Sequence, residues 1–262
     1  MTGTPPTWQR RALLAAGALA LAGWVLILPR LMSGLPSGLG FRDLPDLPPF
    51  RELATPGSVS APNTAFAGIE KAQAPDPDQM RRIAEVRAAP CAALFGQMTD
   101  QRLPVAFFTD FNCPNCRVLD AILTEYDRAN PGMIRIIRHE LPLLGDASVT
   151  AARAVLAADR QGASAALQKR LMRAPAVTDP AYVAALAASV GIDQNRLLAD
   201  MQSPKIDAVL NQSKAIASVF GFYAVPGTVI GRTVVLGAIP AGDVAQIIRL
   251  ERAALPLTCK PA

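Results

Sequence analysis

The feature that most constrains this chain is a pair of cysteines placed between a strand-like segment and a helix-like segment. Residues 103–111 form an apolar run of strand length, and residues 116–129 carry apolar side chains at helical spacing. Cys113 and Cys116 lie where the first segment gives way to the second. Because two intervening residues let one helical turn bring the sulfurs within bonding distance, the pattern predicts a redox-active pair at a helix N-terminus.

The start of that helix indicates which cysteine reacts. Unpaired backbone N–H groups and the helix dipole favour a thiolate at Cys113, and the thiolate is the nucleophile in disulfide exchange. Pro114 suits the first helical turn, because its missing N–H costs nothing there. We expect Cys116, one turn further along, to be more buried and to act as the resolving thiol.

An inert structural disulfide and half of a zinc site are the alternatives for such a pair. Tetrahedral zinc needs four ligands, but the sequence has no second Cys-x-x-Cys motif and a single histidine, His139. His139 falls on a predicted strand, where a satisfied, half-exposed side chain is the usual case, so we give it no role. We therefore expect redox chemistry, with no metal and no cofactor.

The segments that follow the pair predict an α/β domain. They comprise a second strand at 133–141, a mainly helical block at about 147–220, a hairpin formed by 227–231 and 233–237, and a final helix at 241–255. The resulting order is β-α-β, then the helical block, then β-β-α.

An apolar segment near the N-terminus predicts insertion into a membrane. Residues 12–28 are seventeen uncharged residues, with Arg10 and Arg11 before them and Arg30 after them. The small-x-small cleavage patterns lie inside the run rather than after it, which favours an uncleaved transmembrane anchor over a removed signal peptide. The excess of positive charge before the run places residues 1–11 in the cytoplasm. On either interpretation the rest of the chain crosses the membrane.

The next region is rich in proline. Residues 29–90 hold ten of the 23 prolines, which interrupt helices and central strands. We interpret 29–90 as a linker in which residues 31–77 form an extended tether with little packed structure and residues 78–89 form a short helix. The folded domain then covers residues 91–262. Four apolar side chains of the tether remain able to dock on a neighbouring surface: Leu44, Leu47, Phe50 and Phe66.

The charge distribution argues against a nucleic-acid partner. The net charge is +5, but residues 1–40 hold three arginines and no acidic residue, which leaves +2 for the remaining 222 residues. No basic stripe with interleaved aromatic residues remains after that subtraction.

Three stretches of the sequence resemble the DsbA-like family of thioredoxin-fold proteins. FFTDFNCPNC at 107–116 is similar to the active-site segment, LPLLG at 141–145 to the stretch before the helical insert, and FGFYAVPGTVIGRTVVLG at 220–237 to the cis-proline loop and terminal hairpin. The resemblance covers about residues 100–255. It implies a thioredoxin-like core with an inserted helical domain, preceded here by the predicted transmembrane helix. It also implies a cis bond at Val225–Pro226, facing the cysteines, where the Val225 backbone can pair with an extended substrate.

The sequence departs from the family pattern at sites that affect proton and electron transfer. Asn115 stands where the strong oxidants of the family have histidine, and the loop at 224–226 reads Ala-Val-Pro where Gly-Thr-Pro is common. The buried acid of some members falls at Phe107, which leaves the proton acceptor for Cys116 open. Asp110 is a candidate proton relay, but an aspartate at a strand end equally often forms a turn or a cap.

Two further cysteines, Cys91 and Cys259, flank the predicted domain. An even number of cysteines in an oxidising compartment favours a disulfide over free thiols or a redox relay. Four cysteines allow three pairings, and only the pairing of Cys91 with Cys259 leaves the Cys-x-x-Cys motif intact. We therefore expect a structural disulfide between them.

The sequence thus predicts a membrane-anchored thiol–disulfide oxidoreductase of the periplasm, held in the inner membrane by a single pass. Its substrates are expected to be protein or peptide thiols, and its redox partner a membrane or periplasmic protein. The alternative is a non-catalytic peptide- or partner-binding module with a permanent disulfide. A binding module has no need of a proline beside reactive sulfurs at Val225–Pro226, which favours the enzyme.

Overall fold

The structure, a computed structural model, describes residues 38–61, 76–98 and 100–257. The predicted cytoplasmic segment 1–11 and the predicted anchor 12–28 lie outside these ranges. Within the described ranges, no helix combines the length and the apolar character needed to cross a bilayer.

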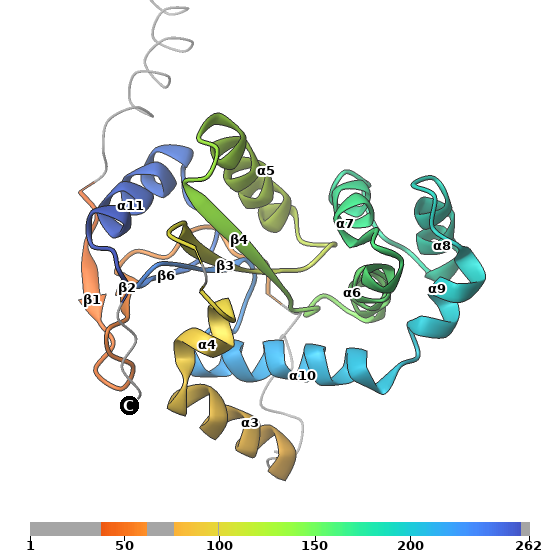
Figure 1. Cartoon of the computed structure of the whole chain (residues 1–262), viewed down its shortest axis with the longest axis horizontal. Coiled ribbons are helices and arrows are strands. Elements are labelled where there is room, and N and C mark those ends of the chain that lie inside the picture. The colour runs from red at the N-terminus through yellow and green to blue at the C-terminus, as the bar shows by residue number, and fades with distance from the viewer. Residues whose placement is uncertain (1–37, 62–75, 99, 258–262) are drawn as a thin grey trace, which may run out of the picture.

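A six-stranded mixed sheet forms the centre of the molecule, in the order β1-β2-β6-β5-β3-β4 (Figure 1). Its strands are β1 (Phe41–Asp43), β2 (Arg51–Leu53), β3 (Leu103–Thr109), β4 (Ile134–Glu140), β5 (Gly227–Ile230) and β6 (Thr233–Leu236). β3 is parallel to β4 and antiparallel to β5, while β2 is parallel to β6 and antiparallel to β1. All seven residues of β3 are buried, as its continuous apolar run requires.

Helices cover both faces of the sheet and also form a separate unit beside it. They are α3 (Pro77–Ala88), α4 (Pro90–Phe95), α5 (Pro114–Ala129), α6 (Asp146–Ala158), α7 (Ser164–Met172), α8 (Pro180–Ala188), α9 (Gln194–Asp200), α10 (Pro204–Val219) and α11 (Ala241–Ala253), with a 3-10 turn at Asp159–Gln161. α5 and α11 lie on one face of the sheet, and α4 and α10 lie on the other, with α3 packed against α10 (Figure 1). α6 to α9 form the separate unit. The block predicted at about 147–220 is helical from α6 to α10, but its last helix, α10, packs on the sheet as well as against α6.

Two hydrophobic clusters correspond to these two parts of the molecule. The larger cluster lies around the sheet and includes Phe107, Cys113 and Cys116. The second cluster lies inside the helical unit and includes Phe111. Because Phe111 lies between β3 and Cys113 in the chain, the active-site loop connects the two cores.

The predicted tether is wrong for its described part, residues 38–61. β1 and β2 pair with each other, and β2 extends the sheet alongside β6. Phe50 is only 1% exposed and packs edge-on against Phe220, with 5.0 Å between the ring centroids. Strands of three residues carry no periodicity that a sequence can reveal, and the open edge of β6 supplies their hydrogen-bond partners.

The domain also begins earlier than residue 91. The helix predicted at 78–89 is confirmed as α3, which starts at an Asp76 cap and packs against α10. Cys91 lies buried on α4, whereas Cys259 lies outside the described residues. The disulfide between these two cysteines stays a prediction.

A partly buried ion pair anchors β2 to α11. The Arg51 guanidinium lies 2.7 Å from a carboxylate oxygen of Glu251 on α11 and stacks over the Phe41 ring. Glu251 also accepts hydrogen bonds from the Arg232 backbone at 3.0 Å and from the Thr233 hydroxyl at 2.8 Å. Burial raises the pKa of Glu251, but these hydrogen bonds outweigh that effect and leave its pKa below the usual value.

Candidate active site

The cysteine pair lies at the N-terminus of α5. Cys113 is the N-cap residue, and its sulfur accepts a hydrogen bond of 2.9 Å from the backbone N–H of Cys116. The two residues form a disulfide, with 5.2 Å between their Cα atoms. Pro114 occupies the first turn, as expected. The sulfur of Cys113 is therefore placed at the positive end of a 16-residue helix, where a thiolate is stabilised.

Both cysteines are inaccessible to solvent in this arrangement. Cys113 and Cys116 are each 0% exposed, so the expectation that Cys116 is the more buried of the two is wrong. The physical reason is that the N-terminus of α5 is itself packed against another segment, the loop that contains Val225. In this arrangement the sulfur of Cys113 is not reachable from solvent.

The loop before β5 faces the pair, as the resemblance implied. The Val225–Pro226 peptide bond is cis. The carbonyl oxygen of Val225 lies 3.7 Å from the sulfur of Cys113. Gly227, the first residue of β5, has no room for a side chain, because a Cβ there would lie 2.7 Å from the Phe222 ring. Close packing behind the loop therefore holds Val225 against the sulfur.

A segment far upstream completes the site. We call residues 57–61 the strap. Ser60 donates its backbone N–H to the Val225 carbonyl at 2.7 Å, and Val225 donates its own N–H to the Ser60 carbonyl at 3.0 Å. The Asn115 side chain, located between the two cysteines, donates to the Ser60 hydroxyl at 3.1 Å. The strap lies within the predicted tether, and nothing in its sequence indicated a place at the active site.

Asp110 directly follows β3, and each of its carboxylate oxygens accepts two hydrogen bonds. One carboxylate oxygen accepts from the Asn112 backbone at 2.8 Å and from the Ser148 hydroxyl at 2.7 Å. The other accepts from the backbone N–H groups of Leu143 and Leu144 at 2.8 and 3.0 Å. These four bonds favour the turn-forming interpretation of Asp110 over a proton relay.

The loop that carries the cysteines is tied to the helical unit by polar side chains. Arg117 donates to the carbonyl oxygens of Pro175 and Phe111, each at 2.6 Å. Asn112 exchanges two hydrogen bonds with the Val177 backbone, at 2.8 and 3.2 Å. Burial lowers the pKa of Arg117. The helical unit therefore restricts the motion of the active-site loop.

A buried acid that the sequence did not single out lies close to the end of β3. Glu140 ends β4, pairs in register with Thr109 and is 4% exposed. Burial raises the pKa of Glu140 to about 8, so its carboxyl group is protonated at neutral pH. Phe107, at the position of the family's acid, is fully buried on β3. The sequence signal was an acid at the end of a strand in a mostly apolar sheet.

His139 has the satisfied, partly exposed position expected for it. Its Nε2 lies 2.9 Å from the Leu94 carbonyl, and its ring stacks on Phe108 at 4.6 Å between centroids. Burial lowers the pKa of His139. Within the described ranges, no group of three histidine, cysteine, aspartate or glutamate side chains is arranged to hold a metal ion.

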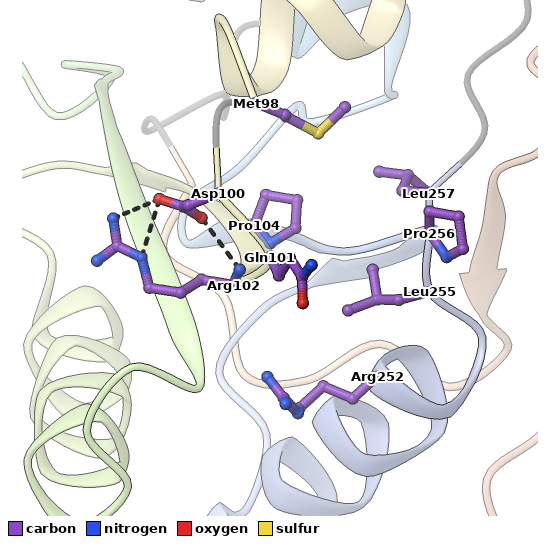
Figure 2. A pocket seen from close by; sticks show the side chains of 9 residues that line it. All are labelled: Met98, Asp100, Gln101, Arg102, Pro104, Arg252, Leu255, Pro256 and Leu257. Atoms are coloured by element: carbon purple, nitrogen blue, oxygen red, sulfur yellow. Dashed lines mark hydrogen bonds and ion pairs between the residues drawn. The ribbon is translucent and has the colours of Figure 1, made fainter.

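A cavity of about 550 Å³ lies at the other end of β3 from the cysteines (Figure 2). Pro104, near the start of β3, lines it together with Arg252 and the segment 255–257. Asp100 and Arg102 form an ion pair of 2.6 Å at its wall. The cavity begins where β3 begins, whereas Cys113 follows the end of β3, so it does not serve the disulfide chemistry.

Comparisons with known proteins agree with this geometry. Residues 104–249 match the DSBA-like thioredoxin domain. A thioredoxin-like oxidoreductase from Silicibacter pomeroyi DSS-3 is 31% identical with a TM-score of 0.59, over 63% of this chain and 98% of that one. The catalytic domain of Proteus mirabilis ScsC is 25% identical with a TM-score of 0.56, over 66% and 98% of the two chains.

A more distant structure shares the fold alone. The thiol-disulfide exchange protein α-DsbA2 from Wolbachia pipientis is 16% identical with a TM-score of 0.56, over 68% of this chain and 99% of that one. No curated protein matches the sequence.

Proposed function

The chain belongs to the family of DSBA-like thioredoxin domains, and from this premise we propose that it exchanges disulfides with protein or peptide thiols through Cys113 and Cys116. One observation carries the proposal. The sulfur of Cys113 caps the N-terminus of α5 and lies 3.7 Å from the carbonyl oxygen of Val225, on the loop with which an extended peptide substrate would pair.

The exchange proceeds in two balanced steps. A substrate thiolate attacks the Cys113 sulfur, a mixed disulfide forms, and Cys116 leaves as a thiolate that takes up a proton. A second substrate thiolate then attacks the substrate sulfur of the mixed disulfide and releases Cys113 as a thiolate. Two electrons pass from the substrate to the pair, and the Cys116 N–H and the helix N-terminus stabilise the Cys113 thiolate.

The direction of net transfer depends on a second redox partner. A membrane or periplasmic disulfide that reoxidises the pair makes the chain an oxidase, and a dithiol donor makes it a reductase or isomerase. The apolar residues 12–28, with their flanking arginines, support an anchor that places the domain on the periplasmic side of the inner membrane.

A second candidate function has one observation in its favour. Cys113 and Cys116 are both fully buried, as in a permanent structural disulfide. On that interpretation the protein binds peptides or a partner without redox chemistry.

One titration separates the two functions. The folded chain is equilibrated in glutathione buffers of graded potential, its thiols are counted, and the oxidation of a reduced two-cysteine peptide is followed. We expect a reduction potential between about −270 and −120 mV, because Asn115 brings no positive charge to the thiolate. A pair that stays oxidised below about −300 mV and leaves the peptide reduced would contradict the enzyme and support the binding module.

A further inference from the structure

The strap is bound to the sheet along its length. Besides the two hydrogen bonds between Ser60 and Val225, Ser58 donates to the Ala238 carbonyl at 3.0 Å and accepts from the Ala238 N–H at 2.8 Å. Gly57 donates to the Leu236 carbonyl at 2.8 Å. The pairs Ser58–Ala238 and Ser60–Val225 are both antiparallel bridges. The strap therefore runs as an extended chain past the loop that contains Val225.

The approach of the strap to the sheet depends on the absence of side chains. A Cβ on Gly57 would lie 2.6 Å from the Ala238 carbonyl carbon, and a Cβ on Gly237 would lie 2.8 Å from the Cα atom of Gly57. Gly237 also has a φ of +93°, which side chains disfavour. Two glycines therefore let the two backbones meet here.

The strap uses the same backbone groups that an incoming peptide needs. An extended peptide that delivers a thiol to Cys113 pairs with the backbone N–H and C=O of the residue that faces that sulfur, which is Val225. Ser60 already uses both. A serine also has the shape of a cysteine without its redox chemistry, and the Ser60 hydroxyl is bound by Asn115 between the two cysteines.

We propose that the strap is an internal competitor, which occupies the substrate position at Val225 and must leave before a peptide substrate pairs there. This inference rests on the proposed function, since it assumes that peptides react at Cys113. In the strapped state Cys113 is completely buried. The chain then divides between a strapped form and an open form, and the apparent affinity for peptides falls with the open fraction.

Two substitutions displace the strap by different means. Ser60→Pro removes the N–H that binds the Val225 carbonyl, and Gly57→Val places a branched side chain against the Ala238 backbone. Val59→Ala is the matched control, because Val59 is 38% exposed and its side chain takes no part in the backbone pairing. Hydrogen exchange at the Val225 amide shows independently whether the strap has left.

The measurement compares an extended two-cysteine peptide with dithiothreitol, which needs no strand pairing. Displacing the strap should raise kcat/KM for the peptide by about three- to tenfold more than the rate with dithiothreitol. Val59→Ala should leave both rates unchanged. The Val225 amide should exchange faster in both displaced variants and at the wild-type rate in the control.

The possible failures are distinct. Equal rises for both reductants would mean that the strap only shields the sulfur, and an unchanged or lower peptide rate in a folded variant with a fast-exchanging Val225 amide would make the strap merely structural. Either result overturns the internal competitor alone. A wild-type pair that does not react even with dithiothreitol overturns the proposed function and this inference together.

Discussion

The active-site turn and the strap meet at Val225, but their geometry has different origins. Residues 113–116 owe their arrangement to a local event, the start of α5, in which Cys113 caps the helix and Pro114 occupies its first turn. Residues 57–61 have no regular structure of their own and are held by hydrogen bonds to Val225, Leu236 and Ala238. The comparison teaches that local sequence sets the chemistry of this site, whereas long-range pairing sets access to it.

The largest expected effect tests the active-site turn, residues 113–116. Cys113→Ser should abolish thiol exchange, because it removes the nucleophile at the helix N-terminus. Cys116→Ser should instead accumulate mixed disulfides, because the resolving thiol is lost. Non-reducing gels after incubation with a disulfide-bonded peptide measure both, since a free Cys113 thiolate attacks the peptide disulfide, forms the mixed disulfide and releases a peptide thiolate. Trapped partners with Cys113→Ser and none with Cys116→Ser would reverse the two roles.

The second expected effect tests a long-range contact, the ion pair between Arg51 on β2 and Glu251 on α11. Glu251→Gln should lower the free energy of unfolding at pH 7 by about 3 kcal/mol, because Arg51 loses its buried carboxylate partner. The folded pKa of Glu251 is depressed, so its contribution is present at neutral pH and is lost as pH falls through that pKa. The difference between the variant and the wild type should therefore shrink in acid.

Urea denaturation at several pH values measures this loss. Glu52→Gln is the matched control, since the ion pair of Glu52 with Arg42 is solvent-exposed. It should change stability by no more than about 0.5 kcal/mol. An equal loss of stability in the two variants would show that burial of the ion pair between Arg51 and Glu251 contributes nothing to the free energy of unfolding.

A smaller effect of opposite pH dependence comes from Glu140. The folded state keeps a proton on this carboxyl up to a pKa of about 8, whereas a glutamate has an ordinary value of 4.5. Because the folded state holds this proton more tightly than the unfolded chain does, the contribution of Glu140 to stability is complete below pH 4.5 and is lost as pH rises towards 8. Glu140→Gln should make the protein more stable than the wild type at pH 8, by about 2 kcal/mol or more.

Denaturation curves at pH 5 and pH 8 measure this reversal. Glu125→Gln, on the exposed surface of α5, serves as the control. A Glu140→Gln variant whose stability follows the wild type in parallel over this range would mean that Glu140 ionises normally.

The smallest expected effect concerns Asn115, which lies between the two cysteines and contacts the strap at Ser60. Asn115→His should raise the reduction potential by about 30 mV, because an imidazolium stabilises the reduced thiolate form. Asn115→Ala removes the contact with Ser60 without adding charge and should leave the potential nearly unchanged. Equilibration with glutathione measures both. Equal shifts in the two variants would assign the effect to the lost strap contact rather than to charge.

Much of the fold was predictable because its signals are local. The apolar run of β3, the helical spacing of α5 and the glycine-centred hairpin at Gly231 each show in a short window of sequence. β1 and β2 were missed because three-residue strands have no periodicity, and their partner edge on β6 is far away in the chain. Glu140 was missed because its pKa depends on burial by surrounding elements.

The reactive pair, its place at a helix start and the order of the elements around it follow from the amino-acid sequence, since they depend on neighbouring residues and their conformational preferences. The segments that cover the pair are known only from the folded chain. Hydrogen bonds between Ser60 and Val225, burial of Glu140 and the anchor from Glu251 to Arg51 join residues that are distant in sequence. Such contacts depend on how the whole chain packs, because each partner is supplied by another part of the fold.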